Sequence, residues 1–157
     1  MMKIAFVTGA RSEYGIMRRV IKELSSDDDF QVFIVATGMH YLSKYGSTID
    51  EIRKDGLAAI IDAPCYTEEN RAKEEDFIAV INSLYDVFCR YRYDAIYIIG
   101  DRIEAYGAAL AAHFSKIPVV HFAGGQITEG AVDNIYRYNI SNLCYIHLVT
   151  NIYAKQR

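Results

Sequence analysis

Charged and glycine residues follow several apolar runs of the sequence, and they are the residues best placed to do chemistry. The first such loop, residues 8–15, reads Thr-Gly-Ala-Arg-Ser-Glu-Tyr-Gly. Backbone amides at a helix start favour an anionic group such as a phosphate, and Arg11 would add a bidentate partner. The loop matches neither the GxGxxG dinucleotide fingerprint nor a P-loop. The alternative is a plain tight turn with Arg11 paired to Glu13 at the surface.

A second charged loop begins where the predicted strand 94–99 ends, and it reads Gly-Asp-Arg-Ile-Glu from residue 100 to 104. A strand this apolar seldom runs directly into three charged residues without a functional reason. Asp101 can be a catalytic carboxylate, partly desolvated at a sheet edge so that its pKa is tunable. Alternatively, Asp101 caps the helix that follows.

A third loop, residues 121–126, reads His-Phe-Ala-Gly-Gly-Gln. Its paired glycines, Gly124 and Gly125, let a ligand approach the backbone closely, or they serve a turn that needs positive φ. Further along, Asp133 and Arg137 are four residues apart on a predicted helix and can form a simple surface pair.

Short β-rich runs alternate with helical segments along the chain. Strands are predicted at 3–8, 30–36, 57–61, 94–99, 118–122 and 144–150. Helices are predicted at 15–24, 47–54, 72–90, 103–115 and 133–143, with Gly56 as a left-handed C-cap and a last helix beginning within 151–157. Residues 64–71 are predicted to be polar and irregular.

This alternation predicts an α/β fold with βαβ units: a Rossmann-like, mainly parallel sheet with helices on both faces. Ligands of such sheets bind outside the carboxyl ends of the strands. The candidate loops are therefore 8–15, 37–45, 100–104 and 123–133.

Composition narrows the class of protein further. The 157 residues carry a formal net charge of −3 and are 52% hydrophobic, which predicts one globular domain over residues 1–157. The chain has no basic block for nucleic acid and no apolar run long enough to span a membrane. Cys65, Cys89 and Cys144 are expected to be buried thiols of a cytoplasmic protein. Four scattered histidines argue against a zinc site, and we expect no metal and no cofactor.

Taken together, the loops resemble one family, the UDP-N-acetylglucosamine 2-epimerases, and especially the hydrolysing branch of sialic- and legionaminic-acid synthesis. The resemblance runs over essentially the whole chain. The matching segments are residues 7–15, 37–40, 45–48, 100–102, 118–121, Gly124-Gly125, and Arg137 followed by Ile140-Ser141.

The resemblance implies the amino-terminal half of a glycosyltransferase-B-like fold, with a carboxyl-terminal UDP-binding domain that lies outside this chain. The implied reaction removes the proton at sugar C2, expels UDP to give a 2-acetamidoglucal, and adds water to give N-acetylmannosamine. A nucleotide sugar is the implied partner, and a homodimer is possible. We expect this chain alone to be inactive.

Residue roles are carried over only where the motifs match. The resemblance implies catalytic roles for Arg11, Asp101 and Asp133. We predict substrate contacts from Gly9, Arg11, Glu13, His40, Arg102, Glu104, Gly124, Gly125, Gln126 and Arg137.

The sequence also departs from the family pattern at three clustered positions. Ala123 stands where the family places a functional Glu or His, Gln126 replaces an acid, and Tyr138 replaces a His. These departures leave open a divergent substrate, a different base or a catalytically weakened relative. A module that binds a nucleotide sugar, or a partner chain, without turnover is therefore the second hypothesis. A flavodoxin-like or receiver-type domain is a third, although a receiver needs an acidic cluster after the first strand.

Overall fold

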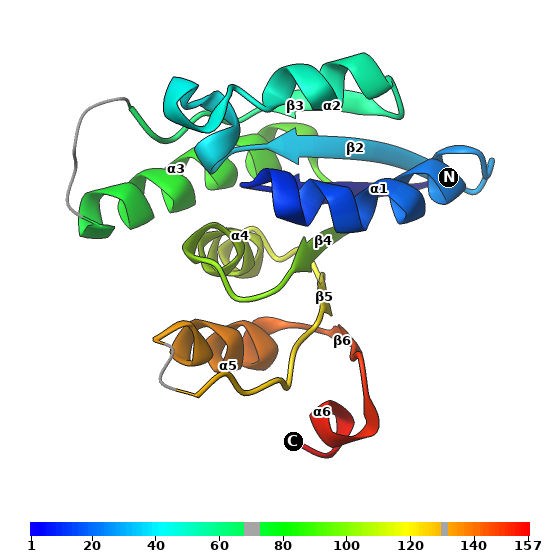
Figure 1. Ribbon diagram of the computed structural model, residues 1–157. Coiled ribbons are helices and arrows are strands. Elements are labelled where there is room, and N and C mark those ends of the chain that lie inside the picture. The colour runs from blue at the N-terminus through cyan, green and yellow to red at the C-terminus, as the bar shows by residue number, and fades with distance from the viewer. Residues whose placement is uncertain (68–72, 130–131) are drawn as a thin grey trace.

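The computed structural model describes residues 1–67, 73–129 and 132–157. Its elements are β1 (Met2–Thr8), α1 (Arg11–Ser25), β2 (Phe30–Ala36), η1 (Gly38–Tyr41), η2 (Ser43–Tyr45), α2 (Ile49–Asp55), β3 (Ala59–Asp62), α3 (Lys73–Tyr91), β4 (Ala95–Ile99), α4 (Ile103–Phe114), β5 (Val119–Phe122), α5 (Asp133–Leu143), β6 (Ile146–Leu148) and α6 (Ile152–Gln156). The strands form one sheet in the order β3-β2-β1-β4-β5-β6 (Figure 1).

Every pairing between neighbouring strands of this sheet is parallel, as the alternation of strands and helices predicts. Successive residues of β1 face opposite sides of the sheet, since strand side chains alternate. Ile4 and Phe6 enter a core cluster with α1 and α2, whereas Ala5 and Val7 enter a second cluster with α3, α4 and α5. The prediction of helices on both faces is therefore confirmed.

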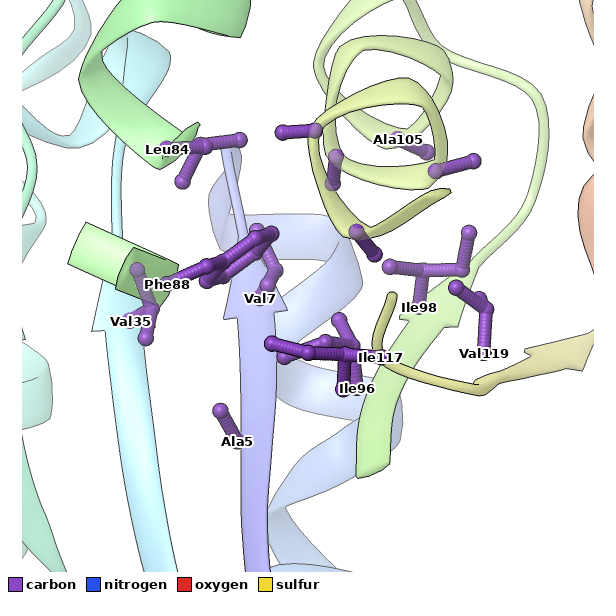
Figure 2. Packing of buried hydrophobic residues seen from close by; sticks show 14 of the residues in the cluster. Ala5, Val7, Val35, Leu84, Phe88, Ile96, Ile98, Ala105, Ile117 and Val119 are labelled. Atoms are coloured by element: carbon purple, nitrogen blue, oxygen red, sulfur yellow. The ribbon is translucent and has the colours of Figure 1, made fainter. Parts of the chain in front are cut away.

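The larger core cluster lies under three neighbouring helices. Figure 1 shows α3, α4 and α5 next to one another on the same side of the strands. In Figure 2, Leu84 and Phe88 of α3 and Ala105 of α4 face Val7 of β1 and Ile98 of β4. The alanines of α4 are buried, and such small side chains let this helix pack closely against the sheet.

Helix α1 begins at Arg11 rather than at the predicted Gly15. The cause lies in Glu13, whose Oε2 accepts hydrogen bonds from the backbone N–H groups of Gly9 (2.7 Å) and Ala10 (3.2 Å). Two amides that a helix start leaves without partners are thereby satisfied, so the helix can begin at once. Periodicity of apolar residues could not reveal this start, because the first turn is polar.

Other boundaries shift by a few residues. Strand β3 covers 59–62 rather than 57–61, and β6 covers only 146–148 of the predicted 144–150. The loop after β2 forms the two short helices η1 and η2. The predicted start of the third helix, residue 72, lies outside the described residues. Gly56 has φ of 59°, which confirms it as the left-handed C-cap of α2.

The three thiols have different environments. Cys65 is buried and Cys144 is half-buried, whereas Cys89 is exposed. The expectation of buried thiols is therefore wrong for Cys89, which lies on a face of α3 turned away from the core. Among the helices of the described residues, none is both long and apolar enough to cross a membrane.

Candidate functional site

The carboxyl ends of β1 and β4 meet at the point where the strand order reverses direction. Chain connections run outward from here on both sides, to β2 and β3 and to β5 and β6. The helices that follow β1 and β4 cover opposite faces of the sheet, so their connecting loops diverge and leave a crevice. The loops that precede α1 and α4 both lie at this edge, as predicted.

Two buried carboxylates and one arginine meet in this crevice, and we call them the Glu13–Arg102–Glu104 cluster. Glu104 is 1% exposed and Glu13 is 6% exposed. The guanidinium of Arg102 contacts both oxygens of Glu104, with Nε and Nη2 each at 3.2 Å. Its Nε also lies 3.8 Å from Oε1 of Glu13. One guanidinium thus serves two acidic side chains from two different helices.

Two glycines make room for Glu104. A Cβ at Gly9 would stand 2.7 Å from Cγ of Glu104, and a Cβ at Gly38 would stand 3.0 Å from the same atom. Gly38 also has φ of 56°, which favours glycine. The predicted site residue Gly9 is therefore required because a buried carboxylate packs against its backbone.

Glu13 holds its proton more tightly than an ordinary glutamic acid. Burial raises its pKa to about 7, and the nearby charge of Glu104 adds to the rise. The amides of Gly9 and Ala10 and the charge of Arg102 act in the opposite direction but do not outweigh burial. Glu13 is therefore present in both the acid and the carboxylate form near neutral pH.

The first loop differs from the phosphate cradle that its position suggests. The amides of Gly9 and Ala10 already donate to Glu13, so they are not free to bind a phosphate. Arg11 is an exposed residue whose Nε lies 3.0 Å from Glu51 of α2. The alternative of an Arg11–Glu13 surface pair is therefore wrong as well, since Glu13 is buried.

Asp101 pairs with Arg137, and this ion pair joins the loop after β4 to α5. Arg137 is 6% exposed, and its Nη1 also donates to the carbonyl of Gln126 (2.6 Å). Two of the alternatives are wrong. Arg137 is not bound to Asp133, and the N-cap position of α4 is Arg102 rather than Asp101.

His40 is completely buried, and both of its ring nitrogens are engaged. Nε2 lies 3.0 Å from Oγ1 of Thr8, and Nδ1 lies 2.7 Å from Oγ1 of Thr48. Because the Thr8 hydroxyl donates to the carbonyl of Ala10, Nε2 is the nitrogen that carries the proton. Burial lowers the pKa of His40 to about 4, so the ring is neutral at pH 7. This geometry favours a structural role, in which His40 joins β1 to the start of α2.

The Gly124-Gly125 pair packs against its own chain. A Cβ at Gly124 would stand 2.9 Å from Nδ1 of His121, and a Cβ at Gly125 would stand 2.3 Å from the carbonyl oxygen of Ala154. Gly125 also has φ of 72°, as the turn alternative requires. Gln126 donates from Nε2 to Oγ1 of Thr150 at 2.6 Å.

A cavity of about 430 Å³ opens beside the Glu13–Arg102–Glu104 cluster. Three predicted site residues line it: Arg102, Glu104 and Asp133. The remaining predicted residues lie around this edge without lining the cavity. Their roles in substrate binding and catalysis stay predictions.

The cavity also has lining residues that sequence reasoning missed. Two of them are Tyr66 and Tyr136. Tyr136 lies one helical turn after Asp133, so the two share a face of α5. Tyr66 follows β3, and the rule that ligands bind after the carboxyl ends of strands applies to that loop as well. The sequence of that loop predicts only a polar, irregular segment.

The fold and this edge define a Rossmann-like α/β domain with its site at the switch point of a parallel sheet. The family model for UDP-N-acetylglucosamine 2-epimerases matches residues 22–157, so the chain belongs to this family. The UDP-N,N'-diacetylbacillosamine 2-epimerase (hydrolyzing) of Legionella pneumophila is 36% identical to this chain over 157 residues. The polysialic acid biosynthesis protein P7 of Escherichia coli is 34% identical over 159 residues. The alignments cover 99% and 100% of this chain respectively, and 41% of each relative.

A solved structure supports the same assignment. The crystal structure of UDP-GlcNAc 2-epimerase from Neisseria meningitidis bound to UDP-GlcNAc superposes with a TM-score of 0.86 at 26% sequence identity. The match covers 99% of this chain and 42% of that one. The chain thus spans about two fifths of the length of the relatives it matches.

Proposed function

We propose that this chain is the amino-terminal domain of a sugar-nucleotide 2-epimerase of the hydrolysing type. The whole protein would convert a UDP-linked 2-acetamido sugar into UDP and the free C2 epimer. A second domain would supply most contacts to UDP, so the present chain by itself would be inactive. Cytoplasmic location and a homodimer remain predictions.

One observation carries the proposal. This chain belongs to the 2-epimerase family and has a cavity, lined by Arg102, Glu104 and Asp133, at the switch point of its sheet. A guanidinium there suits the negative charge of a diphosphate. The exposed carboxylate of Asp133 at the same cavity suits proton transfer to or from the sugar. The apolar lining, which includes Met39 and Ile103, would exclude water from part of the reacting sugar.

The proposed reaction begins with removal of the C2 proton by a carboxylate. The electron pair of the C–H bond forms the C1–C2 double bond as the C1–O bond to UDP breaks, which gives the 2-acetamidoglucal. Water then adds at C1, and C2 is protonated from the opposite face. Asp101 and Asp133 are the proposed acid and base groups, and Arg11 and Arg102 the proposed cations for the leaving diphosphate.

The relatives differ in the sugar that their names state. The Legionella protein is named for UDP-N,N'-diacetylbacillosamine, whereas the Neisseria structure contains UDP-GlcNAc. Both sugars carry the acetamido group at C2 that the proposed elimination uses. We therefore propose this class, a UDP-linked 2-acetamido sugar, as the substrate.

A binding module without turnover is the second candidate, and Ala123 favours it. The methyl side chain of Ala123 cannot exchange a proton, although the resembled family has a functional Glu or His at this position. Its φ of 67° is also costly for a residue other than glycine. The neighbouring Gln126 is bound to Thr150 and likewise offers no acid.

The full-length protein decides between the two candidates in heavy water. We expect it to release UDP from UDP-GlcNAc or UDP-N,N'-diacetylbacillosamine, detected by phosphorus NMR. We also expect deuterium at C2 of the free sugar, detected by proton NMR. Calorimetric binding of either nucleotide sugar with no UDP release would establish the binding module instead.

A further inference from the structure

We propose that Glu13 is a positioning residue whose proton controls the net charge of the Glu13–Arg102–Glu104 cluster beside an anionic substrate in the cavity. The inference rests on the proposed function, because it assumes that a nucleotide sugar occupies this cavity. It assigns to Glu13 a role different from the direct substrate contact that its motif suggests.

Burial places Glu13 behind the cavity rather than in its wall. Its side chain is 7% exposed and absent from the cavity lining, whereas the Arg102 side chain is 40% exposed and lines it. Glu13 therefore acts on a bound ligand through its charge beside Arg102 and not by direct contact. Their closest charged atoms, Oε1 of Glu13 and Nε of Arg102, are 3.8 Å apart.

The two oxygens of Glu13 have different surroundings. Oε2 accepts from the amides of Gly9 and Ala10, which anchors the side chain in one orientation. Oε1 is buried and has no hydrogen-bond partner among the described residues. A buried oxygen without a donor is costly as a carboxylate oxygen, and it is the natural place for a proton.

The protonation state of Glu13 changes the charge of the whole cluster. With Glu13 neutral, the guanidinium of Arg102 and the carboxylate of Glu104 balance each other. With Glu13 charged, two carboxylates face one guanidinium and the cluster is negative. A diphosphate in the adjoining cavity is then repelled, so substrate binding favours the protonated form.

The neighbouring His40, Tyr66 and Cys65 stay neutral between pH 6 and 8. His40 is neutral with a pKa of about 4. Burial raises the pKa of both Tyr66 and Cys65 above their usual values, and the charge of Glu104 raises them further. The pKa of Glu13, about 7, by contrast falls inside this interval.

The first test follows KM for UDP-GlcNAc from pH 6 to 8.5 in the full-length protein. We expect KM to rise roughly tenfold through pH 7, with a smaller change in kcat, because one added charge near the ligand acts mainly on binding. Glu13→Gln mimics the protonated form, so its KM should stay level. Glu23→Gln, an exposed change on the same helix, should keep the wild-type profile. Equal profiles for all three proteins would overturn the inference while the proposed function stands.

The second test does not depend on turnover. Carbon-13 NMR of labelled glutamate carboxyl groups identifies Glu13 as the resonance that Glu13→Gln removes. Because coupling is reciprocal, saturating UDP-GlcNAc should raise the pKa of Glu13 by about one if affinity differs tenfold between its two forms. An unchanged pKa, with resonances of cavity residues shifted by the ligand, would overturn the inference alone. Absence of both turnover and ligand-induced shifts would overturn the proposed function, and the inference with it.

Discussion

Replacing Glu13 with glutamine should change how the stability of the chain depends on pH. Glutamine has nearly the same shape as protonated glutamic acid, and its Oε1 can accept the amides of Gly9 and Ala10. It cannot ionise, however. The comparison of the two proteins therefore isolates the free energy of placing one carboxylate in this buried site.

The sign follows from the raised pKa of Glu13. An unfolded glutamate ionises at a pKa near 4.5, whereas the folded one ionises at about 7. The folded state therefore holds its proton more tightly, and this stabilisation is complete below pH 4.5. It is lost as pH rises from 4.5 to 7, because the unfolded chain ionises first.

The size of the effect follows from the same pKa values. The difference in proton affinity between the two states corresponds to about 3 kcal/mol at about 1.4 kcal/mol per tenfold change. As pH rises from 4.5 to 8, we expect the free energy of unfolding of Glu13→Gln to come to exceed that of wild type by this amount. The corresponding rise in Tm is on the order of 6–12 °C. At pH 4.5 the two proteins should be nearly equal in stability.

Urea unfolding followed by circular dichroism at several pH values measures this difference directly. Glu23→Gln on the exposed face of α1 is the control, and its difference from wild type should stay flat. A free-energy difference between Glu13→Gln and wild type that does not change with pH would refute the reasoning. It would mean that Glu13 ionises normally in the folded protein.

Three further predictions concern the site. Gly9→Ala places a methyl against buried Glu104 and should lower the free energy of unfolding by about 1–3 kcal/mol, measured by urea denaturation; a neutral effect would contradict the close packing. Asp101→Asn removes the proposed acid or base but keeps an oxygen that can accept from Arg137. It should therefore lower UDP release by the full-length protein at least ~100-fold while the far-ultraviolet circular dichroism spectrum stays unchanged; wild-type release would remove Asp101 from catalysis. Ala123→Glu adds an acid at the divergent position and should speed UDP release on the order of tenfold; a slower enzyme would show that its chemistry does not use an acid there.

Local patterns were enough to predict the elements and the class of fold. Apolar runs, helical periodicity and Gly56 depend on neighbouring residues, and the parallel α/β sheet follows from their alternation. The motifs in the loops were also enough to identify the family, because they lie in sequence order. Boundaries at Arg11 and within β6 were missed, since side-chain hydrogen bonds and edge pairing decided them.

The partners of the charged residues were decided by the tertiary structure. Asp101 pairs with Arg137, 36 positions away, and Arg11 pairs with Glu51. Sequence reasoning offered Glu13 as the partner of Arg11 and Asp133 as the partner of Arg137, only two and four positions away, because only local spacing is visible in one chain. The sequence by itself determined which elements form and that their loops meet at one edge. Folding decided that Glu13 is buried there, because only the packed sheet and helices exclude water from its carboxyl group.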